Sequence, residues 1–159
     1  MIRELQTRIS QRALTVWKIH GAIHAFDLIL VSGSTIPLTL FFDWPLWIIP
    51  ATMGPALLLS YFFIWVWPKL KWRRWRYEVR ETEIELQHGV IFTKRTLVPM
   101  IRVQHVDTNQ GPILKKYNLA TVEISTAATV HKIPALDLNE AEELRYYIGK
   151  LTKVADEDV

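Results

Sequence analysis

Residues 44–67 read WPLWIIPATMGPALLLSYFFIWVW, a stretch that contains no charged side chain. A helix rises about 1.5 Å per residue and the hydrocarbon core of a bilayer is about 30 Å thick, so roughly 20 apolar residues suffice to cross it. A second apolar stretch lies directly before it, at residues 19–42, IHGAIHAFDLILVSGSTIPLTLFF. The sequence therefore predicts a transmembrane hairpin with spans over residues 19–42 and about 45–67.

The connection between the two stretches is Phe42-Asp43-Trp44-Pro45, which leaves room only for a tight turn with Pro45 beginning the second helix. Two alternatives fit less well. A signal peptide has one short apolar core and a cleavage site of small residues, not two consecutive spans. Buried helices of a soluble bundle carry a polar stripe, and residues 48–67 have little of one.

Charge and aromatic residues orient the hairpin. Short loops rich in Lys and Arg stay on the cytoplasmic side, and tryptophan concentrates at the two membrane interfaces. The connection carries only Asp43, whereas basic residues flank the hairpin on both outer sides: Arg3, Arg8, Arg12 and Lys18 before it, and Lys69, Lys71, Arg73, Arg74 and Arg76 after it. We expect a multi-pass protein of the bacterial plasma membrane with both termini in the cytoplasm.

The 159 residues then leave room for one soluble domain. We expect an N-terminal cytoplasmic or interfacial segment over residues 1–18, the hairpin over residues 19–67, a cytoplasmic domain over residues 69–153 and an acidic tail over residues 154–159. Ile2, Leu5, Ile9 and Ala13 are spaced by three and four, which predicts an amphipathic helix on the membrane surface. The chain has no cysteine, which excludes disulfides and thiolate chemistry.

Past Lys69 the hydrophobic pattern has a period of two, which is typical of half-buried strands. We predict short antiparallel strands near residues 74–80, 84–86, 90–92, 96–98, 102–106, 120–125 and 130–133, with breaks at Gly89 and at Lys94-Arg95. A helical turn is predicted over residues 112–117, ending at Asn118.

An amphipathic helix closes the chain. Asp137 or Asn139 can cap it, with Glu140 or Glu142 at its third position. Its apolar face would consist of Leu138, Ala141, Leu144, Ile148 and Leu151. Short strands followed by one such helix predict a bent antiparallel sheet or sandwich whose open end the helix covers.

Several short motifs in this order resemble one family, the membrane-flanked, YdbS-like proteins with a bacterial pleckstrin-homology-like (PH-like) domain. The resemblance covers nearly the whole chain, from Ile9-Ser10 to the closing helix. The motifs that carry it are Val98-Pro99, Arg102-Val103-Gln104-His105-Val106, Gln110-Gly111-Pro112, Leu119-Ala120, Ile124-Ser125-Thr126-Ala127 and Glu140-Ala141.

This resemblance implies an α+β membrane protein in which the two-helix hairpin is followed by a seven-stranded PH-like barrel or sandwich, capped by the C-terminal helix. It implies no enzyme, and it carries over no catalytic, cofactor-binding or metal-binding residue. Related domains elsewhere bind lipid headgroups, peptides or proteins, so the fold alone does not fix the function.

One polar cluster stands within the predicted spans. His20, His24 and Asp27 share a helix face at i, i+4 and i+7, a spacing that permits a metal ligand set or a proton relay. The alternative is that they serve helix pairing or hydration near the interface. His88, His105 and His131 fall on predicted strands and are expected to be surface or core residues.

The basic run after the second span alternates with tryptophan, a pattern that in a soluble protein would suggest nucleic acid. Its position directly after a span favours contact with anionic lipids through Lys69, Lys71, Arg73, Arg74 and Arg76, and we expect no nucleic-acid partner.

Three function classes follow. The first is a non-enzymatic assembly protein that binds itself or a larger membrane-flanked relative, within an envelope-protection system. The second is a small transporter or ion-conducting oligomer that uses Asp27. The third is a module that binds lipid headgroups.

Overall fold

The computed structural model describes residue 5 and residues 7–157, and these divide into two compact units. One unit is Leu14–Leu70. The other combines the described residues up to Ala13 with those from Lys71 onward. The second unit is therefore built from chain segments on both sides of the first.

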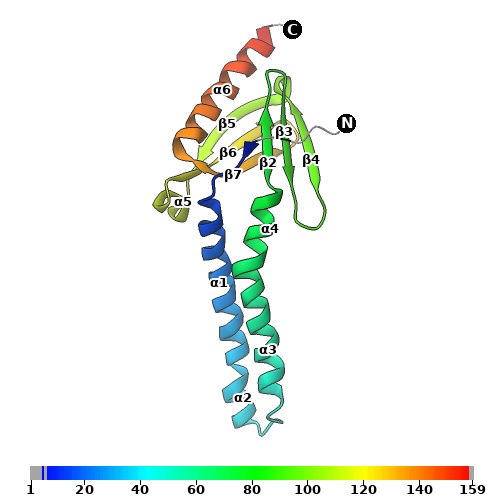
Figure 1. Ribbon diagram of the computed structural model, residues 1–159, viewed down its shortest axis with the longest axis vertical. Helices are drawn as coiled ribbons and strands as arrows, with labels where there is room; N and C mark the ends of the chain where they lie inside the picture. Colours follow the sequence, from blue (N-terminus) through cyan, green and yellow to red (C-terminus); the bar gives the residue numbers. More distant parts are fainter. Residues whose placement is uncertain (1–4, 6, 158–159) are drawn as a thin grey trace. The chain divides into compact units, whose positions relative to one another are not determined.

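The first unit is a pair of long helices that run side by side (Figure 1). The outgoing arm contains α1 (Ala13–Gly33) and α2 (Thr35–Phe41), and the returning arm contains α3 (Ile48–Tyr61), the π-helix η1 (Phe62–Val66) and α4 (Trp67–Arg74). The arms Ala13–Phe41 and Ile48–Arg74, with 29 and 27 residues, are each long and apolar enough to cross a membrane.

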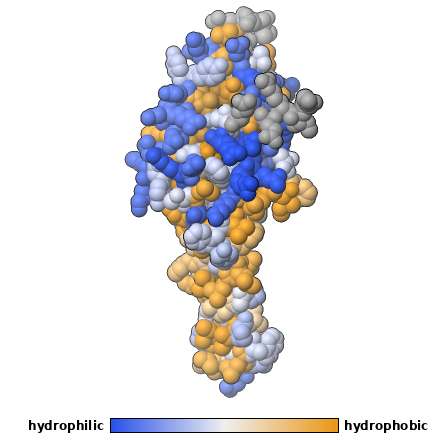
Figure 2. Space-filling model, in the orientation of Figure 1, coloured by the Kyte–Doolittle hydropathy of each residue, from blue (hydrophilic) through white to orange (hydrophobic). Residues whose placement is uncertain are grey.

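The surface of these arms is also typical of membrane-spanning helices. Only 17% and 11% of their most apolar windows are buried, whereas a core helix of a soluble protein would be mostly covered. In Figure 2 the helical arms are predominantly hydrophobic, and hydrophilic residues gather over the strands of the other unit. The predicted transmembrane hairpin is thus matched by two apolar helices.

The connection differs from the prediction at Pro45. The second arm begins at Ile48, so residues 42–47 form the turn. Asp43 takes a left-handed conformation with φ of 50°, which Asp tolerates better than most residues, and the Trp44 N–H donates to the Thr39 carbonyl at 3.0 Å. The Ile48 N–H in turn donates to the Pro45 carbonyl at 3.1 Å. The turn is therefore longer than the sequence suggested.

Contacts of small and polar residues help to hold the arms together. Gly21 lies against the backbone of η1, where a β-carbon would collide with the carbonyl oxygen of Phe63. Nearer the turn, the hydroxyls of Thr35 and Thr52 are 3.0 Å apart and hydrogen-bonded. Small residues and interhelical hydrogen bonds are the usual means by which helices associate in lipid.

The second unit contains two antiparallel sheets. The first has the order β1-β2-β3-β4, and the second has the order β5-β6-β7. Their strands are β1 (Thr7–Arg8), β2 (Arg76–Val79), β3 (Glu83–His88), β4 (Lys94–Pro99), β5 (Val103–Asn109), β6 (Leu119–Thr126) and β7 (Val130–Asp137). Two short helices join them, the 3-10 helix η2 (Met100–Arg102) and α5 (Pro112–Lys116), and α6 (Leu138–Glu157) ends the chain.

This arrangement confirms most of the predicted strands and the helical turn, which ends with Asn118 at φ of 55°. The predicted strand over residues 90–92 is wrong. Those residues form the turn between β3 and β4, which Gly89 starts with φ of 114°. The expected break at Lys94 is instead the start of β4, whose residue Lys94 pairs with His88. The described residues form seven strands, which lie in two open sheets and not in a closed barrel.

The buried side chains come from both sheets and from α6. Ile84 and Leu86 of β3, Ile124 of β6, Ile133 of β7 and Ile148 of α6 are almost completely inaccessible to solvent. Alternate residues of the central strand β6 are buried, as expected where one face of a sheet covers a core.

The N-terminal segment differs from the predicted amphipathic helix. Thr7 and Arg8 form β1 and pair with Tyr77 and Arg76 of β2, and Leu5, Ile9 and Ala13 are buried. Ile2 lies outside the described residues. The apolar residues spaced along this segment therefore contribute to the core of the second unit.

The C-terminal helix starts at Leu138, so Asp137, and not Asn139, precedes it. Ala141 and Ile148 of the predicted apolar face are fully buried. The Tyr77 hydroxyl of β2 donates to Glu140 at 2.8 Å and ties the first sheet to the start of α6. The helix continues to Glu157, so residues 154–157 of the expected tail are helical.

Candidate functional site

The titratable residues of the first span lie on the outer surface of α1. His20, His24 and Asp27 all have exposed side chains, and the His20 Nδ1 atom lies 2.9 Å from the Val16 carbonyl oxygen. Across residue 5 and residues 7–157, no group of three His, Cys, Asp or Glu side chains is arranged to hold a metal ion. The shared helix face is real, but these residues alone do not form a metal site.

Exposure of Asp27 has an energetic consequence. An ionised carboxylate at depth in a bilayer costs several kcal/mol, so such groups usually face a protein partner or a water-filled cavity. The neighbouring side chains of Ile23 and Val31 are exposed as well, at 49% and 65%. This face of α1 thus presents an acidic group with exposed apolar residues one turn before and one turn after it.

The predicted lipid-contact residues differ in their exposure to solvent. Lys69, Arg73 and Arg74 are exposed, whereas Lys71 and Arg76 are partly buried. Arg76 donates to the Leu5 carbonyl at 3.2 Å. Trp72, within the same basic run, donates to the Ser10 carbonyl at 3.1 Å, and Arg8 lies over its ring at 5.7 Å from the centroid. Part of the run therefore anchors the N-terminal segment to the domain.

A cavity of about 360 Å³ in the second unit was not anticipated from the sequence. Its lining includes Lys71, His88, Lys94, His131 and Lys132, and no carboxylate occurs among the described residues that line it. The residues come from α4, β3, β4 and β7, so they are widely separated in the chain. His88 and Lys94 are a cross-strand pair, and His131 and Lys132 are consecutive residues. Nothing in the linear pattern reveals that these segments meet each other and Lys71.

The ring of His88 is held in place inside this cavity. It stacks on Trp75, with 5.7 Å between ring centroids and 19° between ring planes. Burial, and then the positive charges of Lys94, Lys71 and His131, lower the pKa of His88 below its ordinary value. The cavity is therefore a region of positive potential.

A different charge cluster lies on the first sheet. Arg80 contacts Glu78 at 3.0 Å, Glu83 at 2.7 Å and Glu85 at 3.5 Å, and Arg95 also pairs with Glu85. Every member of this cluster has a partner of opposite charge. These salt bridges link β2, β3 and β4.

Comparisons with known proteins agree with this architecture. The profile of the bacterial PH domain family matches residues 28–152. The chain is 46% identical, over the full length of both proteins, to UPF0699 transmembrane protein YdbS of Bacillus subtilis (strain 168). It is also 27% identical over 101 residues to UPF0699 transmembrane protein YdbT of the same organism, which covers 60% of this chain but 20% of that longer protein.

No solved structure matches the chain. The family match includes about half of the first arm, the whole second arm, strands β2 to β7 and most of α6, and the full-length relative is a transmembrane protein. Along the matched part of the chain, the two apolar arms come before strands β2 to β7 and the C-terminal helix α6. The chain is a transmembrane protein of the bacterial PH domain family.

Proposed function

We propose that this protein is a non-enzymatic assembly protein of the bacterial plasma membrane, which displays its PH-like domain in the cytoplasm and binds a second membrane-embedded chain. The observation that carries the proposal is the exposed face of α1 around Asp27. An acidic group flanked by exposed apolar side chains within a span is stabilised when another helix covers it.

The partner is either a second copy or a larger relative. Bacillus subtilis encodes both a full-length relative of this chain and a longer protein with a related segment. Tethering two weakly binding proteins in one membrane raises their effective concentration, so a modest interface suffices for a stable complex. Protection of the cell envelope under stress is the physiological role that we assign to such a complex.

Disulfide crosslinking tests the interface directly, because the native chain has no cysteine. Single substitutions Ile23→Cys and Val31→Cys place a thiol on the Asp27 face, whereas Ala25→Cys places one on a buried position of the same helix. In native membranes we expect mild oxidation to link the first two variants into dimers, or to a longer membrane protein when that is coexpressed with a matching cysteine. The Ala25→Cys variant should remain monomeric.

A transporter is the second candidate, and the same residue favours it, since Asp27 is an exposed ionisable group within a predicted span. The two proposals differ in their tests. If none of the cysteine variants crosslinks, and Asp27→Asn abolishes an ion flux into sealed vesicles, the assembly proposal is wrong and the transporter proposal takes its place.

A further inference from the structure

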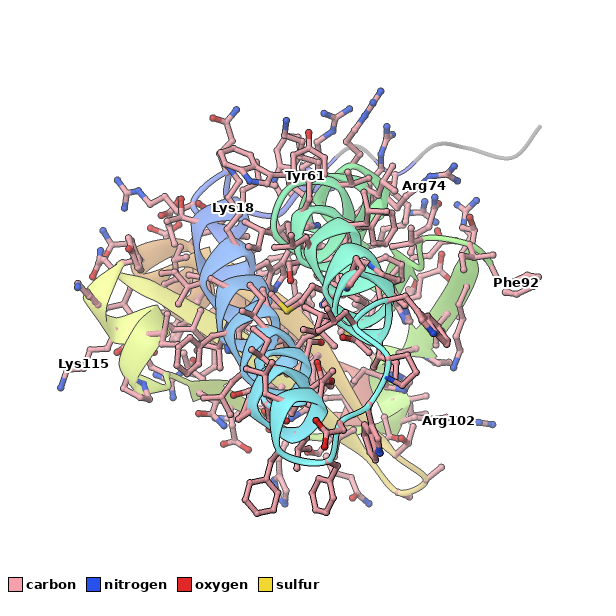
Figure 3. The ribbon with its side chains drawn as sticks, turned by 90° about the horizontal axis from the view of Figure 1, so that it is seen from below. Lys18, Tyr61, Arg74, Phe92, Arg102 and Lys115 are labelled. Carbon is pink, nitrogen blue, oxygen red and sulfur yellow. The ribbon has the colours of Figure 1, made fainter. Side chains whose placement is uncertain are left out.

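The outgoing arm packs against the returning arm along one line of residues. These residues follow one another at alternating steps of four and three, and all are buried or half-buried: Gly21, Ala25, Leu28, Ser32, Thr35 and Thr39. Such spacing is typical of helices that pack at a shallow angle, as in most membrane bundles. Figure 3 looks along the arms from the turn and shows the returning arm beside one flank of the outgoing arm. Within residues 14–70, no other helix covers the remaining flanks.

The Asp27 face lies on an adjoining flank and has the same spacing. Each of its positions comes one residue before a position of the first line, and all six are exposed: His20, His24, Asp27, Val31, Ser34 and Leu38. It contains every titratable residue of the predicted first span, residues 19–42. The titratable groups of this span are thus concentrated on a line along which a further helix can pack.

His24 and Asp27 have no partner within the described part of the chain. Across residue 5 and residues 7–157, neither side chain forms a hydrogen bond or an ion pair. His20 differs, because its Nδ1 atom lies 2.9 Å from the Val16 carbonyl oxygen. An unpartnered imidazole and an unpartnered carboxylate are both costly in hydrocarbon, and an imidazole N–H that donates to a carboxylate satisfies both groups. The missing partners are therefore expected to come from another molecule.

The Asp27 face is complementary to a copy of itself. His24 and Asp27 are three residues apart, which is about 4.5 Å along a helix axis, and they share one face. Copies of one protein insert with the same orientation, so their α1 helices run parallel. In a parallel pair packed along this face, position 24 of one helix lies beside position 27 of the other, and two-fold symmetry repeats the contact.

We propose that the Asp27 face binds a second copy of this chain, in a parallel two-fold dimer in which His24 of each protomer donates a hydrogen bond to the partner's Asp27. The inference rests on the proposed assembly, because it names the chain and the two side chains that cover the same face. A different membrane protein would have to supply both a donor and an acceptor at matching depths, whereas a second copy has both by symmetry. Contact between the exposed apolar residues Val31 and Leu38 adds packing to these hydrogen bonds.

Exchange of the donor and the acceptor tests the pairing. His24→Asp leaves carboxylates at both positions of the face, and Asp27→His leaves imidazoles at both. Each full-length variant also carries Val31→Cys as its single thiol, since the native chain has no cysteine. The two are expressed separately and together in bacterial membranes, with tags of different size, at a level that leaves the Val31→Cys parent partly crosslinked. Mild oxidation followed by electrophoresis then separates like dimers from mixed dimers.

The control adds the same charge on the other side of the helix. At about 100° per residue, position 22 lies opposite position 24, and the side chain of Ala22 is exposed. The variant Ala22→Asp should crosslink with itself as the Val31→Cys parent does. A loss equal to that of His24→Asp would show that any added charge disrupts the dimer, and it would contradict the specific pairing.

We expect His24→Asp alone and Asp27→His alone to lower the crosslinked fraction at least about fivefold, because like groups then face each other in a dry interface. Together they should form mixed dimers at nearly the level of the parent, because each carboxylate regains an imidazole across the interface. Pairing within one chain cannot produce this recovery, since neither variant contains both groups. If the mixture crosslinks no better than the separate variants, the pairing is wrong.

His24→Gln and Asp27→Asn keep the test decisive if a charged variant fails to insert. Each should weaken self-association, and the double variant should be no weaker than either single variant, because both remove the same contact. Losses that add would contradict the pairing. Crosslinking of the parent only to a longer relative would overturn the choice of a second copy but leave the proposed assembly standing. Absence of crosslinking to any chain would overturn the proposed function and this inference together.

Discussion

The pKa of His88 depends on groups that are far apart in the sequence. His88 is the last residue of β3, and its ring is stacked on that of Trp75. Lys94 lies opposite it in the strand pair, and Lys71 and His131 line the same cavity. Burial and these three charges make protonation of His88 unfavourable, and they lower its pKa in the folded protein. In the unfolded chain a histidine has a pKa of about 6.5.

The difference between the two states gives stability a pH dependence with a definite sign. Below about pH 6.5 the unfolded chain takes up a proton that the folded protein resists, so the free energy of unfolding falls as the pH falls through this window. We predict that the thermal midpoint of the full-length protein in nonionic detergent decreases between about pH 7.5 and pH 5.5, and that His88→Gln reduces the decrease. Tryptophan fluorescence during heating measures both.

The matched control removes an exposed imidazole from the same unit, in His105→Gln on β5. This variant should retain the pH dependence of the native protein. If both variants show the same change of thermal midpoint with pH as the native chain, then the lowered pKa of His88 does not contribute measurably to stability.

The strand β1 is the element that most changes the description of the domain. It contains only two residues, yet the segment around it buries Leu5, Ile9 and Ala13 and is held by hydrogen bonds from Trp72 to the Ile9 and Ser10 carbonyls. An interfacial helix would instead have presented these apolar residues to lipid. A core segment and an interfacial helix predict different effects on stability for the same substitution.

We predict that Ile9→Ala lowers the free energy of unfolding of the domain by about 2–5 kcal/mol, because it leaves a cavity at a buried position. Ile101→Ala is the control, since that isoleucine is 54% exposed. Urea titration of the full-length protein, followed by β-sheet circular dichroism, measures both. Equal stability of the two variants would show that the N-terminal segment does not belong to the core.

The elements that the sequence predicted are those whose signal is local. The apolar spans, the alternating strands β2, β3 and β6, and the face of α6 each follow from neighbouring residues. Pairing of Thr7 with Tyr77 is not local, and a two-residue strand has no periodicity to detect. The turn at Ile91 and Phe92 was mistaken for a strand because its apolar residues are exposed, against the usual rule for such residues.

The candidate functional residues also include some that local sequence patterns predict and some that they do not. The face of His20, His24 and Asp27 was visible from helical spacing, and the structure places all three on the outside of α1. The cation-lined cavity was not visible, because it brings together residues from α4, β3, β4 and β7. Lys71 had been assigned to lipid contact as part of a charge run, and its place in that lining appears only once the chain is folded.

For the molecule as a whole, the pairing of β1 with β2 restricts how the chain crosses the membrane. Backbone hydrogen bonds between Thr7–Arg8 and Arg76–Val79 require these segments to lie on the same side of the bilayer. The number of crossings between them must then be even, and two apolar helices of sufficient length lie there. This argument does not depend on the distribution of basic residues.

We predict that a reporter that is active only in the cytoplasm works when it is fused to either terminus and fails when it is inserted at Asp43, in the turn of the hairpin. A reporter that is active only outside the cytoplasm should give the opposite pattern. Activity of the cytoplasmic reporter at Asp43, or at one terminus only, would contradict two spans with both ends inside.

The pairing between residues 7 and 77 also sets the order in which the protein can mature. Strand β1 is synthesised first, and its partner β2 follows the whole hairpin. The first sheet is therefore expected to be completed only after both spans have entered the bilayer. A chain with one misplaced span would leave β2 as an unpaired strand edge, which promotes aggregation. We therefore expect the first sheet to be complete only in chains whose two spans have both inserted.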